Sequence, residues 1–384
     1  MQPPSPSYFF LSLMNGSSWG GSEELWYRTA LLLAHRGANI ACAVYDWKEK
    51  EERLQALQAA GCRVYRLPNK KTITSRSLKK IYRKLKTKVQ LKAAINTLPL
   101  QAYDIVVVNQ GGYEVYTSPW KNVYQRLKNY VLLFHNYNEH QAFSKKQKKA
   151  LQNWVGNAAM NFFAAERIIG VLEEKLSVAI SRAAVLINPI TFDPPVGATA
   201  YPPLQNGNYL LGMLAALDTS RKAQDTLIAV LAAPKWKQRN WQLHLYGEGS
   251  DRHLLQALIN EKGLQEKVFL RGHTADVAGA LRQVHLVLQI TNIDAMPLSV
   301  VEAMAMGRPL VVSRTGDMPQ WVANGQNGWV CDPIPADIDA TLEQAWQAKD
   351  RWEEMGKQSF SLFQQKFPRS PEERFLQQLN ETPG

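Results

Sequence analysis

Two carboxylates in one short segment are the residues of this chain best suited to chemistry. Asp294 lies in a loop after an expected strand, and Glu302 lies in the first turn of the helix that follows. Backbone N–H groups around Leu298 and Ser299, where that helix starts, would suit a diphosphate. A carboxylate beside them cannot help to bind phosphate, but it can accept hydrogen bonds from sugar hydroxyls. The segment therefore predicts a site for a phosphorylated, hydroxyl-rich ligand.

The same segment also has a purely structural interpretation. Ser299-x-x-Glu302 has the spacing of a capping box, in which both side chains satisfy free backbone N–H groups at a helix start. The residue types alone favour neither interpretation. Both can hold, because a capping carboxylate still has free lone pairs.

The elements that must position these residues read as parallel α/β structure. Short apolar runs alternate with longer segments of helical period from one end of the chain to the other. A helix capped by Ser22 is expected to follow the first strand and to end near Gly37. The expected strands are residues 8–14, 39–47, 62–67, 104–109, 131–134 and 184–188, and then 209–214, 241–246, 268–271, 286–290 and 309–313.

Two domains are expected for a chain of 384 residues, because one hydrophobic core rarely serves such a length. We place the first domain at residues 1–190 and the second at 208–345, joined by a proline-rich linker at 191–207. Residues 346–384 read as helices that pack back towards the first domain. Open α/β halves bind ligands at the carboxyl ends of their strands, so we expect the site in a cleft between the domains.

Several further motifs, in order along the chain, resemble those of the GT-B glycosyltransferases of the retaining family GT4 (glycosyl transferases group 1). The resemblance covers nearly the whole chain except residues 67–100, and it is carried by the following segments: Trp19-Gly20-Gly21-Ser22-Glu23, Leu33 to Gly37, Tyr103-Asp104-Ile105-Val106, His135-Asn136, Ile187-Asn188, Arg221-Lys222-Ala223-Gln224-Asp225, Leu245 to Gly249, and Asp294-x7-Glu302 followed by Ala-Met-Ala-x-Gly-x-Pro. Each motif alone is weak, and their order along the chain is what makes the resemblance specific.

The resemblance implies a fold and an activity. The fold would be α/β, with two Rossmann-like domains facing each other across a cleft, the first for the acceptor and the second for a nucleotide-sugar. The activity would be transfer of a sugar from a nucleotide-diphosphate sugar, a UDP- or GDP-sugar, to a glycan or lipid-linked acceptor with retention of anomeric configuration. Cell-surface polysaccharide or glycolipid synthesis would be its setting.

The resemblance also implies roles in the second domain. Glu302 would bind the ribose hydroxyls and Asp294 the donor sugar, although the family usually has glutamate at the position of Asp294. Lys222 would neutralise the leaving diphosphate, a developing charge that has to be stabilised. Arg221 is our candidate to assist it, because Met213 replaces the arginine that the family often carries there.

Other positions receive roles in the same way. Gly20 and Gly21 would let backbone N–H groups approach the donor phosphate or the acceptor. His135 would lie near the anomeric centre and bind a sugar hydroxyl, although a histidine at a strand end is more often structural. Gly247 and Glu248 form a glycine loop that could face the nucleotide base, and an ordinary turn is an equal alternative for Glu248.

No cofactor or metal is expected, because Lys222 and helix ends would serve the diphosphate. The DxD sequence at Asp337 and Asp339 opens a late helix, where acids are favoured in any case. A nicotinamide-dependent oxidoreductase is disfavoured, since Gly16, Gly20 and Gly21 do not form GxGxxG. The remaining alternatives are a non-catalytic phosphate- or nucleic-acid-binding protein, and another GT-B sugar-nucleotide enzyme such as an epimerase.

The charge of the chain points to an anionic partner. The net charge is +12, and no Asp or Glu occurs between Arg53 and Tyr103. Within that stretch a basic amphipathic helix is expected, with a patch formed by Lys79, Lys80, Arg83 and Lys84, for an anionic membrane surface or the acceptor. Its alternative is a solvated helix face. Nucleic acid is a less favoured partner, because no recognition motif accompanies the charge.

The sequence also favours a compartment. Three widely spaced cysteines without CxxC spacing suit a reducing environment. No stretch approaches a membrane span, and the first residues lack the positive region of a signal peptide. We therefore expect a cytoplasmic protein, peripheral at the inner face of the membrane.

Overall fold

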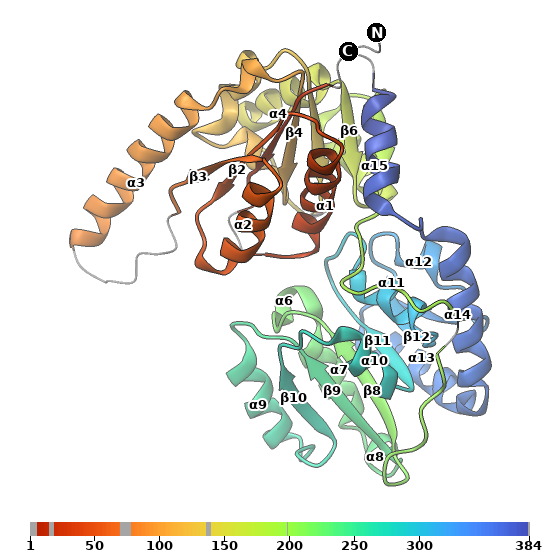
Figure 1. Ribbon diagram of the computed structural model, residues 1–384. Helices are drawn as coiled ribbons and strands as arrows, with labels where there is room; N and C mark the ends of the chain where they lie inside the picture. Colours follow the sequence, from red (N-terminus) through yellow and green to blue (C-terminus); the bar gives the residue numbers. More distant parts are fainter. Residues whose placement is uncertain (1–5, 15–18, 70–77, 136–139, 198, 383–384) are drawn as a thin grey trace. The chain divides into compact units, whose positions relative to one another are not determined.

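The structure is a computed structural model that describes residues 6–14, 19–69, 78–135, 140–197 and 199–382, and the side chains of residues 78–86 are not described. The chain divides into two compact units, each coloured by sequence in Figure 1. Unit 1 comprises Met1–Pro189 together with Arg369–Gly384, and unit 2 comprises Ile190–Pro368. Unit 1 is therefore built from two separate stretches of chain.

A seven-stranded parallel sheet forms the centre of unit 1, in the order β3-β2-β1-β4-β5-β6-β7. Its central strands are apolar and buried on both faces, as expected for a sheet that helices cover on both sides. The strands are β1 (Tyr8–Ser12), β2 (Ile40–Tyr45), β3 (Arg63–Leu67), β4 (Ile105–Gln110), β5 (Tyr130–Phe134), β6 (Met160–Phe163) and β7 (Ala183–Val185).

Six α-helices accompany this sheet in the described part of unit 1. They are α1 (Gly21–His35), α2 (Glu51–Ala59), α3 (Leu78–Thr97), α4 (Lys145–Asn157), α5 (Glu166–Leu176) and α15 (Pro371–Asn380). The last of them comes from the C-terminal stretch and lies beside α1 (Figure 1). Phe375 of α15 packs edge-on against Phe162 at 5.1 Å, and the Tyr8 hydroxyl donates to Asn380. These contacts make α15 part of the core of unit 1.

Unit 2 repeats this architecture with a six-stranded parallel sheet in the order β10-β9-β8-β11-β12-β13. Apolar side chains form a core cluster on each face of the sheet. The strands are β8 (Tyr209–Leu214), β9 (Trp241–Tyr246), β10 (Val268–Gly272), β11 (Leu286–Gln289), β12 (Leu310–Ser313) and β13 (Gly328–Cys331).

The helices of unit 2 cover both faces of its sheet. They are α6 (Thr219–Lys222), α7 (Gln224–Leu231), α8 (Pro234–Lys237), α9 (Arg252–Glu261), α10 (Val277–Gln283), α11 (Leu298–Ala305), α12 (Met318–Trp321), α13 (Pro335–Gln347) and α14 (Trp352–Lys366). In each sheet the strand order reverses at one point, between β1 and β4 in unit 1 and between β8 and β11 in unit 2. Such a switch point leaves room for a ligand at the carboxyl ends of the strands.

The sequence-based fold class is confirmed, and each expected strand overlaps an observed one. Two strands, β6 and β13, were missed. The expected cap of the first helix was wrong, because α1 begins at Gly21 with Gly20 as its N-cap and no capping side chain. Among the described residues, no helix combines the length and the apolar character needed to cross a membrane.

Candidate functional site

The predicted donor residues of unit 2 gather at the switch point between β8 and β11. Arg221 and Lys222 end the short helix α6, which follows β8. Asp294 lies in the loop after β11, and Glu302 lies on α11, which that loop leads into. Residues that are 72 positions apart in the sequence, Lys222 and Asp294, are thereby brought into contact.

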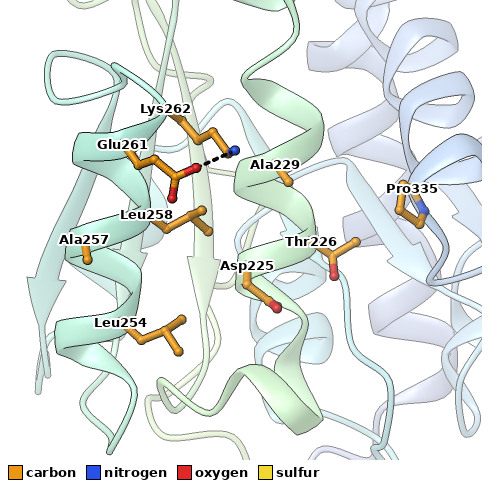
Figure 2. Close-up of a pocket in the computed structure, with 9 residues that line it drawn as sticks. All are labelled: Asp225, Thr226, Ala229, Leu254, Ala257, Leu258, Glu261, Lys262 and Pro335. Carbon is orange, nitrogen blue, oxygen red and sulfur yellow. Dashed lines mark hydrogen bonds and ion pairs between the residues drawn. The ribbon is translucent and has the colours of Figure 1, made fainter.

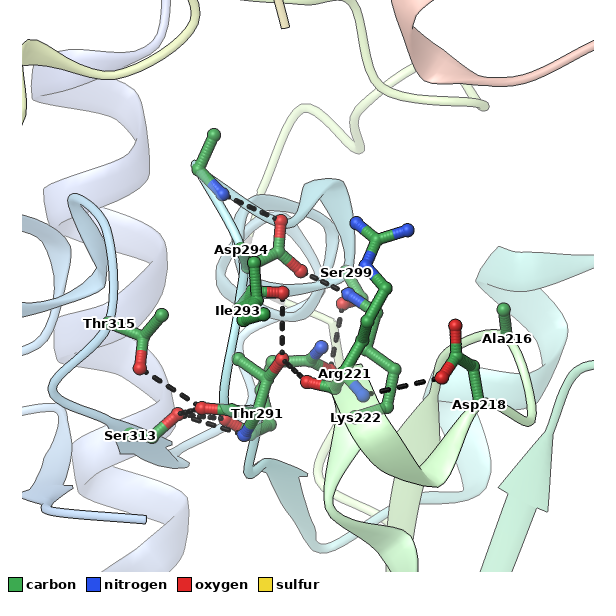
Figure 3. A network of polar contacts seen from close by, with 12 residues as sticks. Ala216, Asp218, Arg221, Lys222, Thr291, Ile293, Asp294, Ser299, Ser313 and Thr315 are labelled. Carbon is green, nitrogen blue, oxygen red and sulfur yellow. Dashed lines mark hydrogen bonds and ion pairs between the residues drawn. The ribbon is translucent and has the colours of Figure 1, made fainter. Parts of the chain in front are cut away.

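Lys222 and Asp294 form an ion pair at this point, and both side chains are largely buried. Figure 3 shows the Lys222 ammonium meeting the Asp294 carboxylate, with the Arg221 guanidinium extending beside them. The other Asp294 oxygen accepts from the backbone N–H of Ala295, at 2.9 Å. Both cations therefore lie next to the carboxylate, as a diphosphate clamp beside a sugar-binding acid would require.

Hydrogen bonds to main-chain carbonyls hold the two loops of this cluster together. The Arg221 carbonyl accepts from the Thr291 hydroxyl at 2.6 Å and from the Asn292 N–H at 2.8 Å. The Thr291 carbonyl in turn accepts from the hydroxyls of Ser313 and Thr315, at 2.8 and 3.0 Å (Figure 3). The position of Arg221 and Lys222 relative to Asp294 is thus set by hydrogen bonds to main-chain carbonyls, most of them donated by short hydroxyl side chains.

Glu302 is buried, with 4% of its surface exposed. Its Oε1 accepts from the Thr191 N–H at 3.1 Å and from the Thr191 hydroxyl at 2.7 Å. Thr191 precedes β8 in the chain, so the first segment of unit 2, which leads into β8, holds this carboxylate. Both contacts engage the same oxygen.

The capping-box interpretation of Glu302 is wrong. Helix α11 has Pro297 as its N-cap, and no side chain caps it. The Ser299 hydroxyl donates to Gln289 Oε1 on β11 at 3.0 Å, which ties the helix start to the sheet. Glu302 therefore does not serve the N-terminus of its own helix.

Burial raises the pKa of the Glu302 carboxyl, and the two hydrogen bonds from Thr191 oppose that shift. A buried carboxylate is costly unless donors surround it. Two donors from one threonine satisfy only part of its capacity, since an ionised carboxylate has about four acceptor positions. Glu302 is therefore suited to accept further hydrogen bonds from a ligand.

The loop after β9 packs so closely on the loop after β8 that two of its positions require glycine. A Cβ on Gly247, whose φ is +146°, would lie 2.0 Å from the carbonyl oxygen of Ala215 in the loop after β8. Gly249 has a similar contact, at 2.2 Å from the Leu217 carbonyl oxygen. Glu248 is exposed between them and pairs only at the surface, with Arg252 at 3.4 Å. The loop thus lies directly against the segment that leads to Arg221 and Lys222.

His135 lies directly after β5 in unit 1 and is buried, with 8% of its surface exposed. Its Nε2 contacts Asn109 Oδ1 at 2.7 Å, and its Nδ1 contacts Asn188 Nδ2 at 3.4 Å. Burial lowers the pKa of the imidazole to about 3, so the ring is neutral at physiological pH.

Behind His135 lies a buried ion pair that the sequence did not predict. Lys50 Nζ contacts Glu23 Oε1 at 2.6 Å, and both side chains are almost completely shielded from solvent. Glu23 Oε2 accepts from Ser12 Oγ at 2.8 Å and from Asn109 Nδ2 at 3.1 Å. The indole N–H of Trp26 donates to the same oxygen. A continuous set of polar contacts therefore connects Lys50 to His135.

The glycines before α1 are only partly described. Gly20 has extended backbone with φ −174°, and a Cβ there would meet nothing within 4 Å. Open space at Gly20 is compatible with approach of a ligand to the start of α1. Residues 15–18 and Asn136 lie outside the described residues, as do the side chains of Lys79, Lys80, Arg83 and Lys84.

A surface groove of about 570 Å³ lies elsewhere in unit 2, along α7 and α9 (Figure 2). Leu254, Ala257 and Leu258 line one side, and Asp225 is its one residue from the predicted motifs. Lys222, Asp294 and Glu302 are not among the residues that line it. Asp337 and Asp339, at the start of α13, both accept hydrogen bonds from within the chain. Asp337 accepts from the Asp332 N–H, and Asp339 accepts from Lys235 and from the indole N–H of Trp236.

Sequence reasoning missed four residues of these clusters: Glu23, Lys50, Asn109 and Thr191. Glu23 was noticed only as part of a motif, and Lys50 lies in a run of charged residues that reads as solvated. Asn109 is the last but one residue of strand β4, which is apolar up to that point. That position was the available signal, because a polar residue near the carboxyl end of a parallel strand lies at the ligand-binding edge of the sheet. Thr191 carried no local signal.

Part of the chain matches a known family. Residues 208–347 match the model of the family described as glycosyl transferases group 1. Poly(ribitol-phosphate) alpha-N-acetylglucosaminyltransferase of Staphylococcus aureus is 30% identical over 112 residues. That match covers 29% of this chain and 23% of the relative. The chain therefore aligns with less than a quarter of that relative's length.

Solved structures resemble the chain over its whole length. Anabaena HepE in complex with UDP has a TM-score of 0.71 and 16% identity, with 98% of this chain and 100% of that chain covered. Sucrose-phosphate synthase from Thermosynechococcus elongatus has a TM-score of 0.73 and 16% identity, with 98% of each chain covered. At this level of identity the likeness establishes the fold, which is GT-B.

Proposed function

We propose that the chain is a glycosyltransferase acting on a nucleoside diphosphate sugar, with retention of anomeric configuration, and the match of residues 208–347 to the model of the glycosyl transferases group 1 family supports this. One observation carries the proposal: Lys222, Asp294 and the buried Glu302 occur together at the switch point of one parallel sheet. That set combines a cation for phosphate with carboxylates for hydroxyls, which is the chemistry of a sugar nucleotide.

In this proposal unit 2 binds the donor. Glu302 accepts hydrogen bonds from the ribose hydroxyls, and its contacts to Thr191 through Oε1 alone support that role. Backbone N–H groups of Leu298 and Ser299 approach the diphosphate at the start of α11. Gly247 and Glu248 lie beside the base, which the close packing of their loop on the segment before α6 supports.

Lys222 neutralises charge on the leaving diphosphate, and Arg221 assists it. Lys222 is paired with Asp294, so the phosphate oxygens of a donor have to compete with that carboxylate for the ammonium. Asp294 then becomes available to the hydroxyls of the transferred sugar. As the bond to the anomeric carbon breaks, negative charge grows on the diphosphate. A fixed cation stabilises this charge and so lowers the activation free energy of transfer.

Unit 1 binds the acceptor in this proposal. His135 lies near the reacting carbon and contacts a sugar hydroxyl, and Gly20 with Gly21 lets ligand atoms approach the start of α1. A neutral imidazole at physiological pH suits hydrogen bonding to a hydroxyl and does not suit charge neutralisation. The leaving phosphate oxygen takes the acceptor proton on the same face, which is consistent with retention.

We propose a UDP-sugar as the donor, with a GDP-sugar as the alternative. The UDP complex of the Anabaena protein, which has the same fold, supports this choice. The acceptor is a glycan or a lipid-linked sugar in surface polysaccharide or glycolipid synthesis. The basic patch on α3 would place the protein, in the cytoplasm, at the inner face of an anionic membrane.

A donor screen tests the proposal. The chain is incubated with UDP-, GDP- and ADP-sugars, and mass spectrometry follows release of the nucleoside diphosphate. Thermal stabilisation is measured in parallel, because a ligand that binds only the folded state raises its stability. We expect one sugar nucleotide to stabilise and to turn over, while NAD and duplex DNA do neither. Stabilisation by DNA alone, or no response to any sugar nucleotide, would contradict the proposal.

A further inference from the structure

The buried contacts around His135 have an order of donors and acceptors that the chemistry of their end groups dictates. An ammonium group only donates, so Glu23 Oε1 must accept from Lys50. An indole N–H also only donates, so Glu23 Oε2 must accept from Trp26. This oxygen is therefore an acceptor towards every group that it contacts.

Asn109 takes its orientation from that oxygen. Of its two amide atoms only the nitrogen can donate, so Nδ2 faces Glu23 Oε2, at 3.1 Å. The carbonyl oxygen Oδ1 then faces His135 Nε2 at 2.7 Å, and as an acceptor it requires a proton on that nitrogen. A reversed amide would set two acceptors against each other at Glu23.

His135 transmits the order one step further. Its neutral ring carries a single proton, so with Nε2 protonated the Nδ1 atom is an acceptor. Asn188 must then present Nδ2 to it, at 3.4 Å. The oxygen Oδ1 of Asn188 points away, is buried and has no hydrogen-bond partner in the described structure. A buried carboxamide oxygen without a partner costs free energy until a donor reaches it.

We propose that Glu23, its buried charge matched by Lys50, acts through Asn109 to hold His135 as the Nε2–H tautomer, and that this leaves Asn188 Oδ1 as a fixed acceptor for a sugar hydroxyl. Glu23, Lys50 and Asn109 are positioning residues, and Asn188 is the residue that would touch the ligand. The proposal deepens the glycosyltransferase function and rests on it only for the identity of the ligand.

The arrangement explains why a charge is buried here at all. A buried ion pair is weak evidence for stability, because desolvation of both ions offsets their attraction. The pair does specify the direction of the hydrogen bonds, because an ionised carboxylate accepts through both of its oxygens and cannot donate. A neutral hydroxyl in its place could rotate, and the order of the hydrogen bonds would no longer be unique.

The first test is spectroscopic and needs no substrate. The full chain is labelled with 15N-histidine, and the His135 ring signals are assigned by comparison with His135→Gln. We expect the ligand-free protein at pH 7 to show one tautomer, with the proton on Nε2. A proton on Nδ1, or an imidazolium ring, would overturn the proposal whether or not the protein transfers sugar.

Two double variants then separate the acceptor oxygen from the charge. The first, Glu23→Gln with Lys50→Met (the Gln/Met variant), removes both charges but keeps an amide oxygen, which Trp26 and Asn109 hold in place of Oε2. The second, Glu23→Met with Lys50→Met (the Met/Met variant), removes the oxygen as well. Both replace a buried pair by neutral groups of similar size, a change that proteins often tolerate.

The Gln/Met variant should keep the single His135 tautomer, with kcat within about threefold of the wild type, because the acceptor remains. The Met/Met variant should show mixed tautomers, with kcat lowered at least about tenfold. Thermal melts monitored by circular dichroism confirm that each variant folds. Asn109→Leu, which removes the acceptor on Nε2 directly, serves as the second route if the Met/Met variant does not fold. A single Nε2–H tautomer with unchanged kcat in Met/Met or Asn109→Leu would overturn the proposal.

The role of Asn188 is tested with the donor and acceptor that the screen identifies. Asn188→Leu should leave the fold intact and should raise the KM for one sugar substrate about tenfold, the cost of one lost hydrogen bond. An unchanged KM for both substrates would show that Asn188 Oδ1 meets no sugar hydroxyl.

Discussion

Donor binding should depend most on Glu302, because this residue is buried and yet only partly satisfied by Thr191. We expect Glu302→Gln to fold normally and to lose at least about tenfold in affinity for the nucleotide sugar. A hydrogen bond to a charged acceptor contributes about 1.5–3 kcal/mol, and the amide replaces it with a weaker one. Isothermal titration calorimetry measures the affinity. The exposed Glu266, changed to Gln, is the matched control, and equal effects of the two variants would contradict the assignment.

Lys222 and Arg221 are adjacent, but the structure distinguishes them, since Lys222 is the one paired with the Asp294 carboxylate. We expect Lys222→Ala to lower kcat about a hundredfold, because it removes the cation aimed at the leaving diphosphate. Arg221→Ala should have a smaller effect. Steady-state turnover with saturating donor distinguishes them, with the surface residue Lys235 changed to Ala as a control. Equal and mild losses from both variants would mean that another group serves the diphosphate.

The pH dependence of donor binding follows from the environment of Glu302. Burial raises the pKa of this carboxyl, so it takes up a proton at a higher pH than an ordinary glutamate. Protonation removes an acceptor, so donor affinity should fall with acid before surface carboxylates titrate. The same shift means that the folded chain binds this proton more readily than the unfolded chain, so protonation of Glu302 does not itself destabilise the fold. Binding titrations across acid pH should therefore show that donor affinity falls while the protein remains folded. The Glu302→Gln variant should not show this fall in affinity with acid.

At the residue scale, the sequence assigned Asp294 and Lys222 to one site, and the structure brings their side chains into contact. Their roles towards phosphate and sugar stay predictions. Thr191 could not be found, because it lies 111 residues from Glu302 and only the tertiary fold joins them. Lys50 could not be found either, since it occupies a short 3-10 turn, Lys48–Lys50, in which its neighbours remain more exposed. Which member of a charged run turns inward is decided by the packing around it.

At the scale of elements, apolar runs of sufficient length located most strands. Strand β6, Met160–Phe163, was missed because it has four residues and contains Asn161, whose side-chain Nδ2 donates to the carbonyls of Val155 and Arg182. Strand β13, Gly328–Cys331, begins with a glycine after a turn. A Cβ on Gly328 would lie 2.2 Å from the Leu310 carbonyl oxygen, so packing against β12 requires glycine at this position. In a sequence pattern, glycine indicates a loop, and the strand is therefore not recognised.

Helix α3 carries the prediction about membranes. Its 20 residues include no acid, and its basic residues are expected to bind anionic lipid. Replacing Lys79, Lys80, Arg83 and Lys84 by Gln should abolish co-flotation with acidic vesicles and leave donor affinity unchanged. Binding of the wild type should weaken with salt, which screens charge over about 8 Å at physiological ionic strength.

A matched control lies on α4 of the same unit. Replacing Lys145, Lys146, Lys148 and Lys149 by Gln removes the same formal charge from another helix. If this variant also loses binding, net charge accounts for the effect and α3 has no special role. If the wild type ignores acidic vesicles at low salt, the patch on α3 is a solvated face.

At the scale of the whole molecule, the two units differ in how the chain builds them. Unit 2 is continuous, from Ile190 to Pro368, and contains both of its core clusters as well as Thr191, Lys222, Asp294 and Glu302. Unit 1 needs the returning stretch from Arg369, because Phe375 and Leu379 belong to its core. Only unit 2 can therefore be expressed as one uninterrupted segment.

A fragment of residues 190–368 should accordingly fold by itself and bind UDP with an affinity within about threefold of the full chain, because the residues proposed for the nucleotide all lie within it. It should not transfer sugar, since His135 and the glycines before α1 are missing. Calorimetry with UDP and a mass-detected transfer assay measure the two properties. The same fragment with Glu302→Gln controls for specific binding and should bind UDP at least about tenfold more weakly. A folded fragment that fails to bind UDP would place essential nucleotide contacts in unit 1 and would contradict the division of roles proposed here.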